Sequence, residues 1–147
     1  QYKNLLLLDG DHLREVWGDK LGHTIEDRAK NAHRISHLCD LLDQQGIHAI
    51  ACVLSIFPEW QRWNREHFSQ YFEIFLDTPM RLITKRDIKG LYKAAEEGSI
   101  NNVVGFDIDF PKPEASDLII RNEQGLDAVH SLVEEIRSKL PCRESSC

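Results

Sequence analysis

The sequence lacks the features that mark membrane, disulfide-rich and nucleic-acid-binding proteins. Its uninterrupted apolar runs, such as 5–8 and 49–54, reach at most six residues, whereas a membrane-spanning helix needs roughly 20. The four cysteines form no C-x-x-C pair, so nothing requires a disulfide framework or a zinc site. The net charge is −6, and affinity for nucleic-acid backbones generally needs an excess of Lys and Arg. No charged-then-apolar leader is visible either, so we predict a cytoplasmic protein that binds neither membranes nor nucleic acids.

What the chain does contain is enough apolar material for one ordinary domain. It has 147 residues, of which 41% are hydrophobic. We predict a single domain over residues 1–140 and a polar tail over 141–147. Cys39 and Cys52 lie in apolar stretches and are expected to be buried thiols. The chain begins with Gln1 rather than Met and enters a strand almost at once, so we expect further residues upstream.

Short apolar runs alternate with helical patterns along the chain. Strands are predicted over 5–8, 48–54, 72–76 and 118–120, and runs that are apolar on both faces favour a parallel sheet covered on both sides. Helices are predicted over 25–45, with Thr24 as the N-cap and Gly46 as the stop, from Thr78-Pro79 to about 86, and over 125–140. Residues 101–114 form the longest stretch without periodicity. The fold class is therefore α/β, with three layers.

Polar residues follow the predicted strands where ligands bind in open parallel sheets. Asp9-Gly10-Asp11 follows the first strand, Ser55 the second and Asp77 the third. Two carboxylates separated by a glycine can hold a metal ion or accept a proton from a hydroxyl group. The alternative is that Asp11 only caps the next helix. Arg14, Arg28 and Asn31 could bind an anionic substrate through one helix face, or they could form an ordinary solvated face.

Four segments, in order, resemble the adenylylsulfate kinase family. Residues 8–14 (LDGDHLR) resemble its L-D-G-D-N-x-R, and residues 21–28 (LGHTIEDR) with Asn31 resemble L-G-F-S-x-E-D-R-x-x-N. Residues 86–93 (RDIKGLYK) resemble R-D-P-K-G-L-Y-K, and residues 105–107 (GFD) resemble part of G-I-D-D. The resemblance runs from about residue 5 to 139. It implies a P-loop kinase-like domain with a parallel sheet flanked by helices.

The resemblance also implies transfer of the γ-phosphoryl group of ATP, with Mg²⁺, to a nucleotide's ribose 3′-hydroxyl. Asp9 would orient the hydroxyl and bind the metal, and Lys89 would neutralise phosphate charge from a closing segment to which Arg86 also contributes. Ser55 matches a serine for which a phosphoserine has been proposed, and we treat it as a substrate-loop residue. The expected acceptor-binding residues are Asp11, Arg14, His23, Arg28, Asn31, Phe57 and Phe106. Family members often form homodimers, although no apolar surface stripe marks such an interface here.

The chain departs from the family pattern in three places. The Walker A loop, G-x-x-x-x-G-K-[ST], is absent from the 147 residues, and we expect it upstream. His23 and Val103 replace the two phenylalanines that sandwich adenine, and Pro58 replaces an arginine. These changes favour an altered acceptor as the alternative to adenylylsulfate, such as cytidine diphosphoramidate. A non-catalytic nucleotide-binding subunit is a third interpretation.

Two further clusters have simpler explanations. His33 and His37 are four residues apart on one helix and could bind a metal ion, but no further ligand is evident. Trp17, Trp60 and Trp63 could form a stacking platform, whereas Trp60 and Trp63 fit the packed face of a helix better.

Overall fold

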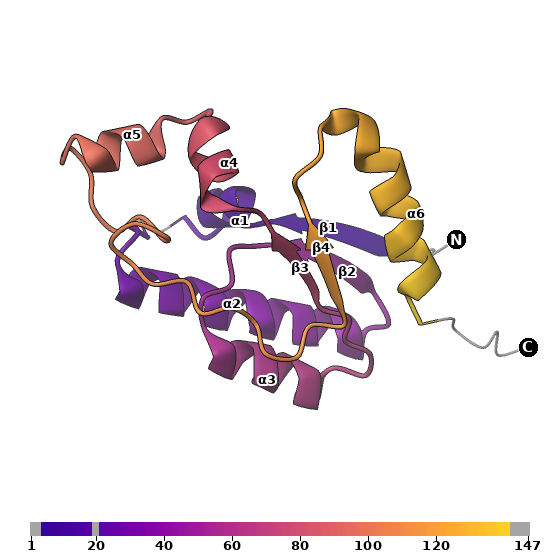
Figure 1. The fold of residues 1–147 in the computed structure, drawn as a ribbon. Helices are drawn as coiled ribbons and strands as arrows, with labels where there is room; N and C mark the ends of the chain where they lie inside the picture. The colour runs from indigo at the N-terminus through magenta and orange to yellow at the C-terminus, as the bar shows by residue number, and fades with distance from the viewer. Residues whose placement is uncertain (1–3, 19–20, 142–147) are drawn as a thin grey trace, which may run out of the picture.

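The structure is a computed structural model that describes residues 4–18 and 21–141 (Figure 1). The elements follow one another in a strand-and-helix alternation. They are β1 (Leu5–Asp9), α1 (Gly10–Val16), α2 (Ile25–Gln44), β2 (His48–Cys52), α3 (Pro58–His67), β3 (Ile74–Asp77), α4 (Met80–Lys85), α5 (Leu91–Glu96), β4 (Leu118–Arg121), the 3₁₀ turn η1 (Leu126–Ala128) and α6 (Val129–Lys139). The predicted α/β class is confirmed.

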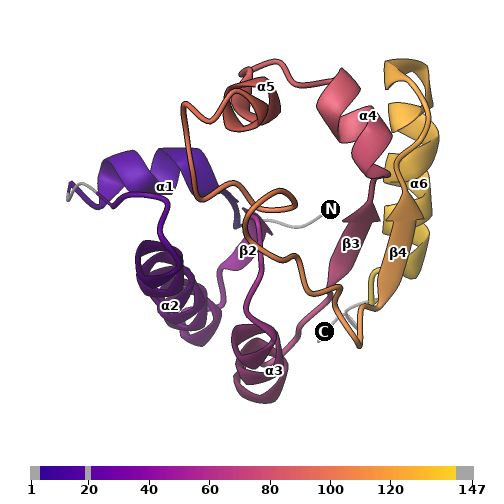
Figure 2. The ribbon, with the colours of Figure 1, turned by 60° about the vertical axis from the view of Figure 1, so that its left-hand side comes forward.

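The strands pair in two parallel couples. β1 pairs with β2 from Leu5 opposite His48 to Asp9 opposite Cys52, and β3 pairs with β4 from Ile74 opposite Leu118 to Asp77 opposite Arg121. Among the described residues no strand joins the two couples into one sheet. Figure 2 shows β3 on the side of its couple that is nearer to β2. The parallel direction is as predicted, but the continuous sheet is not formed by this part of the chain.

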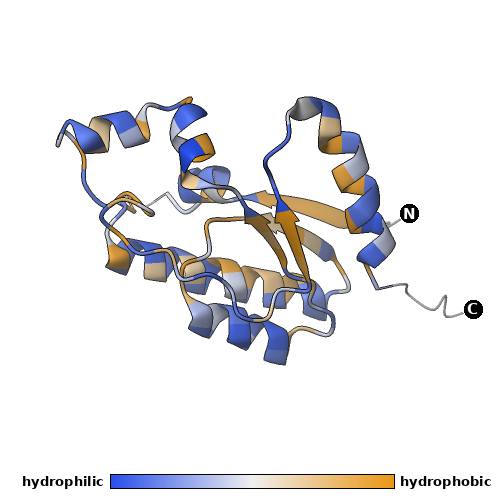
Figure 3. Cartoon of the chain, in the orientation of Figure 1, coloured by the Kyte–Doolittle hydropathy of each residue, from blue (hydrophilic) through white to orange (hydrophobic). Residues whose placement is uncertain are grey.

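Helices cover the strands unevenly. α2 and α3 lie together on one side of the strands, and α6 lies along β4, away from them (Figures 1 and 2). Leu8, Leu13 and Ile35 form a buried cluster between β1, α1 and α2. In contrast, Leu7 is 66% exposed and Leu76 is 56% exposed, and Figure 3 shows that the strands are apolar along their length. Within the described residues, helices therefore flank the strands as predicted, but they leave part of the strand surfaces exposed.

Capping residues explain where several helices begin and end. The Thr24 hydroxyl accepts a hydrogen bond from Asp27 N at 3.2 Å, as the capping pattern predicts, and Gly46 adopts a φ of 69° after α2. α4 begins at Met80 with Pro79 as its N-cap residue and no side-chain cap, so the predicted Thr78 cap is not formed. α6 starts at Val129 rather than 125 because a 3₁₀ turn precedes it.

Candidate active site

The two carboxylates at the junction of β1 and α1, those of Asp9 and Asp11, have different roles. The Asp9 carboxylate caps α1, because its Oδ1 accepts hydrogen bonds from Asp11 N at 2.9 Å and from His12 N at 3.2 Å. The alternative in which Asp11 caps the helix is therefore wrong. Capping fixes the orientation of Asp9 and occupies one of its two oxygens. The side chain of Asp11 is left to face the lid segment, defined here as residues 86–93.

Asp11 and Lys89 form the contact between this turn and the lid segment. Lys89 Nζ lies 2.6 Å from Asp11 Oδ2, and both side chains are largely exposed. The hydrogen bond from Lys89 holds the pKa of Asp11 below its ordinary value, and the same bond raises the pKa of Lys89. Both groups are therefore charged at neutral pH, and the lysine lies directly over the end of β1.

Two arginines add positive charge beside these acids. Arg28 donates from Nε to the carbonyl of His23 at 2.9 Å and from Nη2 to the carbonyl of Asn102 at 2.8 Å. Arg14 donates to the carbonyl of Gly22 at 2.9 Å. Burial first, and the charge of Arg14 second, lower the pKa of Arg28 from its ordinary value. The two guanidinium groups are thus held by backbone carbonyls, and they concentrate positive charge in a chain of net charge −6.

Asn31 lies one helical turn beyond Arg28 on α2 and is buried. Its Oδ1 accepts a hydrogen bond from the indole Nε1 of Trp17 at 2.9 Å. Trp17 packs against the Leu8–Leu13–Ile35 cluster, so it belongs to the wall of the site. The sequence singled out Trp17 only as a stacking candidate, and this hydrogen bond was not expected.

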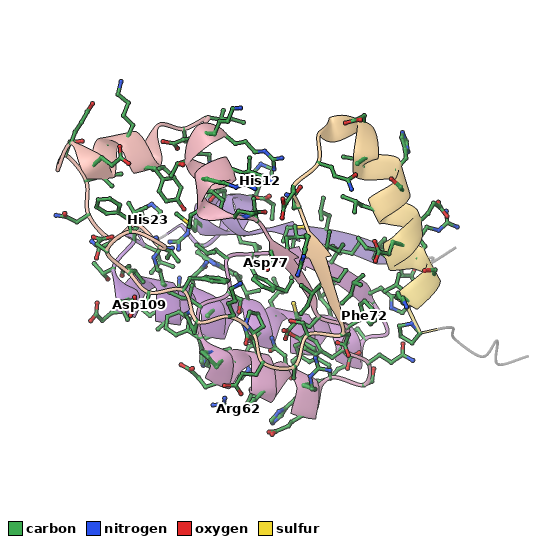
Figure 4. All side chains as sticks on the ribbon, viewed as in Figure 1. His12, His23, Arg62, Phe72, Asp77 and Asp109 are labelled. Atoms are coloured by element: carbon green, nitrogen blue, oxygen red, sulfur yellow. The ribbon has the colours of Figure 1, made fainter. Side chains whose placement is uncertain are left out.

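His23 lies at the start of the segment that leads into α2, where Figure 4 shows it near the loop of residues 101–108. Burial lowers the pKa of His23 first, and the charges of Arg14 and Arg28 lower it further. Asp11 and Asp27 act in the opposite direction but do not prevail. The imidazole is consequently neutral at pH 7 and can both donate and accept a hydrogen bond.

The loop of residues 101–108 is fixed by Asp107, whose carboxylate accepts hydrogen bonds from the backbone N–H groups of Asn102 and Val103. Val103 is only 8% exposed, so it offers little surface to a bound base. Phe106, on the same loop, is 54% exposed and is the apolar side chain available there.

The lid segment is held at both ends. Arg86 donates to the carbonyls of Asn122 and Gln124, at 3.5 and 2.8 Å, which ties the segment to the loop after β4. At the other end, the Tyr92 hydroxyl donates to the carbonyl of Val104 at 3.1 Å. The segment borders an open hollow of about 330 Å³. Its lining residues include Thr78, Arg86, Asp87, Lys89, Tyr92 and Asn122.

The predicted residues Ser55 and Phe57 lie beyond the carboxyl end of β2, the strand next to β1. Gln61 Nε2 donates to Ser55 Oγ at 3.1 Å, and Phe57 is the N-cap residue of α3. Within residues 4–18 and 21–141, Ser55 forms no hydrogen bond to Asp9 or Asp11. Asp77, labelled in Figure 4, ends β3, and its carboxylate forms an ion pair with Lys112 at 3.2 Å. These side chains share the edge of the strands with the acids but do not bond to them.

The last features that the sequence singled out are the histidine pair, Trp60 and two of the cysteines. His33 and His37 pack against Trp60, with ring centroids 5.1 and 5.9 Å away, so α3 packs on α2 through these rings as expected for Trp60. The described residues contain no group of three metal-ligating side chains. Burial raises the pKa of the Cys39 thiol to about 11. Cys52 is exposed, so the prediction that it is buried is wrong.

Comparison with known proteins shows which family the chain belongs to. The family model described as adenylylsulphate kinase matches residues 1–121. The chain belongs to the adenylylsulphate kinase family. The match covers β1 to β4 and so includes the acids after β1, the arginines and the lid segment. None of the helices in the described ranges is long and apolar enough to cross a membrane.

Relatives and solved structures agree with this assignment. The chain is 42% identical over 125 residues to the cytidine diphosphoramidate kinase of Campylobacter jejuni, covering 83% of this chain and 71% of that protein. It is 38% identical over 120 residues to the adenylyl-sulfate kinase of Paraburkholderia xenovorans, covering 81% and 67%. Its fold matches the APS kinase CysC of Mycobacterium tuberculosis in complex with AMPPNP and APS, with a TM-score of 0.77, 32% identity and coverage of 90% and 79%. The predicted phosphotransferase class and P-loop kinase-like fold are confirmed.

Proposed function

We propose that this chain carries the acceptor site of an ATP-dependent kinase that phosphorylates the ribose 3′-hydroxyl of adenylylsulfate. The observation that carries the proposal is a chain of charged groups that starts at the end of β1, where Lys89 and Arg14 act on Asp11 and Arg28 lies near Arg14. Two carboxylates, two backbone-held guanidinium groups and the lid lysine come from β1–α1, α2 and the lid segment. Phosphoryl transfer depends mainly on positioning and charge neutralisation, which such a set provides.

The carboxylates are the groups suited to bind the acceptor hydroxyl and to accept its proton. Asp9 is oriented by the α1 cap and keeps one oxygen that the cap does not use. That oxygen can accept a hydrogen bond from a ribose hydroxyl and later its proton. Asp11 is placed beside it and holds Lys89 over the same point. Substrate phosphates that enter the site would compete with Asp11 for the lysine.

Arg14 and Arg28 are the groups suited to hold the anionic part of the acceptor. Their bonds to carbonyls leave further N–H donors, because each guanidinium carries five. Guanidinium groups bind sulfate and phosphate oxygens through paired hydrogen bonds. The base of the acceptor would then lie toward the ring of His23 and the exposed ring of Phe106, on the two segments that Arg28 links.

The residues present also fit a magnesium ion. Mg²⁺ is usually bound by one or two carboxylates together with substrate phosphates, and Asp9 and Asp11 supply two carboxylates at one strand end. When bound, the ion would neutralise charge on the transferring phosphoryl group. Asp9 is the preferred ligand because Asp11 already has a cationic partner.

The ATP phosphates need a binding loop that these 147 residues do not contain. We propose that a Walker A strand and its helix, expected upstream in the sequence, lie in space between β2 and β3. Each of these strands pairs on one side only within the described residues, and the adjacent strand surfaces include exposed apolar side chains such as Ile50 and Leu76. The hollow beside Arg86 and Asn122 would then lie on the ATP side of the lid segment.

The test is product analysis with the natural protein, ATP and Mg²⁺. With adenylylsulfate as the acceptor, we expect ADP and a new phosphomonoester on the ribose 3′-oxygen, identified by ³¹P NMR. Asp9→Asn should abolish the phosphomonoester while ATP binding persists. ADP release without a phosphomonoester, or no reaction with any nucleotide acceptor, would contradict the proposal; the latter would favour a non-catalytic nucleotide-binding role.

Cytidine diphosphoramidate is the second candidate acceptor. The burial of Val103 and the imidazole at His23 leave less aromatic surface for a purine, and a pyrimidine needs less. The Campylobacter jejuni relative, at 42% identity, is named as a kinase of this compound. The same product analysis distinguishes the two acceptors when each is offered alone.

A further inference from the structure

Trp17 and Asn31 form a hydrogen bond that sets the orientation of the Asn31 side-chain amide. Trp17 is the C-cap residue of α1, and Asn31 lies in the second turn of α2. The indole Nε1 donates to Asn31 Oδ1 at 2.9 Å. The bond therefore connects the helix that carries Asp11 and Arg14 to the helix that carries Arg28.

The chemistry of the indole fixes the orientation of the amide. An indole N–H can only donate, so it must face the carbonyl oxygen of the Asn31 side chain rather than its NH₂ group. The opposite orientation would place two donors against each other. No described residue accepts a hydrogen bond from Asn31 Nδ2, so both of its N–H donors are left for a ligand or for water.

The indole itself has little freedom to move. It packs against the buried Leu8–Leu13–Ile35 cluster on one side. The guanidinium carbon of Arg34 lies 6.0 Å from the ring centroid of Trp17. Asn31 is 8% exposed, and a buried amide with its oxygen unpaired is costly. The hydrogen bond from Trp17 thus holds the Asn31 amide in a single orientation.

We propose that Trp17 is a positioning residue that holds Asn31 with its NH₂ group directed to an oxygen of the nucleotide acceptor. This inference rests on the proposed function, because it assigns a role within that acceptor site. The group recognised would be a hydrogen-bond acceptor, such as a ribose hydroxyl or an anionic oxygen next to Arg28. Trp17 acts through Asn31 and does not itself contact the reacting atoms.

A purely structural role for Trp17, as a brace between α1 and α2, makes a different prediction. Loss of a brace would lower stability and would change kcat together with both KM values. Loss of a positioning bond would act on the acceptor alone. The variant Trp17→Phe removes the N–H donor but keeps an aromatic ring against the cluster, so it separates the two roles.

The experiment measures initial rates of the natural protein with ATP and acceptor varied in turn. For Trp17→Phe we expect the KM of the acceptor to rise about tenfold, while the KM of ATP changes less than about twofold. Trp60→Phe is the matched control, since that indole packs between α3 and α2 through His33 and His37, and it should leave both values unchanged. An unchanged acceptor KM, or equal changes in both KM values, would overturn the inference.

A second measurement separates this inference from the proposed function. In ¹⁵N-labelled protein without ATP, adenylylsulfate and the cytidine compound should each be tested for shifts of the Asn31 side-chain NH₂ signals, with Trp17→Phe reducing the response. If the wild type releases no ADP but these signals shift, the kinase proposal fails and the positioning role stands. If neither acceptor shifts the Asn31 signals while ADP is released, the positioning role fails and the kinase proposal stands.

Discussion

Asp11 and Lys89 are 78 positions apart in the sequence, yet Lys89 Nζ lies 2.6 Å from Asp11 Oδ2. This contact brings the acidic turn at the end of β1 together with the lid segment, which leads into the first residues of α5. Charges at exposed positions attract each other only weakly, so the pair cannot hold the fold together by itself. Under the proposed function its value is positional, because Lys89 would then be the cation that meets the phosphates of a substrate.

We predict that Asp11→Asn lowers kcat/KM by about tenfold to a hundredfold. The amide cannot accept a proton and binds Lys89 more weakly, so the lid segment should also exchange its amide hydrogens a few times faster. Kinetics and hydrogen exchange of residues 86–93 measure both effects. Glu97→Gln is the control, since it weakens only the exposed Lys93–Glu97 pair on α5. Unchanged exchange in Asp11→Asn would show that the contact does not order the lid segment.

Arg28→Lys should raise the KM of the acceptor by about tenfold or more and leave the KM of ATP nearly constant. A lysine cannot reach the carbonyls of His23 and Asn102 and still present paired donors to an anion. Steady-state kinetics with each substrate varied gives the two values. Arg62→Lys, at an exposed position on α3, is the comparison variant. Equal effects of the two substitutions would show that Arg28 acts only through net charge.

The imidazole of His23 should titrate below 6.5, its ordinary pKa, because burial and the two arginines disfavour the protonated form. The unfolded chain then binds the proton more tightly than the folded chain. Stability from this group is therefore complete above pH 6.5 and falls as the pH decreases through that value toward the lowered pKa. NMR titration of the imidazole gives the midpoint. A midpoint at or above 6.5 would contradict the electrostatic description of the site.

Binding of the acceptor should partly offset the lowering of the His23 pKa. An anion beside Arg14 and Arg28 offsets their charge, so the pKa of His23 should rise when the acceptor binds, with proton uptake below pH 6.5. Calorimetry in buffers of different ionisation enthalpy detects the uptake. His23→Phe provides the control without a titrating group. Identical proton uptake in the two proteins would assign the effect to another residue.

Asp87 should be essential for the start of α5. Its carboxylate accepts hydrogen bonds from the backbone N–H groups of Leu91, Tyr92 and Lys93, which are otherwise unpaired in the first turn. Asp87→Ala should cost about 1 kcal/mol of unfolding free energy and loosen α5. Urea denaturation and hydrogen exchange report the two effects. Glu96→Gln on the same helix should change neither, and equal losses in both variants would contradict the capping role.

The sequence predicted the elements better than their assembly. Continuous apolar runs gave the four strands, and the 3.6-residue period with Thr24 and Gly46 gave α2 almost to the residue. α5 was missed because its six residues are too short to show a period, and its cap comes from Asp87, four residues before Leu91. The split into two strand couples depends on long-range pairing that no local pattern encodes.

The site was predicted as residue types and motif positions rather than as contacts. The motifs pointed to Asp9, Asp11, Arg28 and Lys89. The structure joins Lys89 to Asp11 next to the α1 cap of Asp9, and Arg28 lies near Arg14, which acts on the same acid. Pattern alone could not assign the α1 cap to Asp9 rather than Asp11. It also could not show that Asp107 fixes its loop, because that depends on backbone N–H directions in a segment without periodicity.

The central claim is most directly tested by the ratio of kcat/KM for adenylylsulfate to that for cytidine diphosphoramidate. The natural protein is supplied with ATP and Mg²⁺, and ADP release is followed with each acceptor in turn. The proposed function predicts measurable turnover and a ratio above one. A ratio below one would identify cytidine diphosphoramidate as the preferred acceptor. No release with either acceptor would contradict the assignment of this cluster as a kinase acceptor site for these nucleotides.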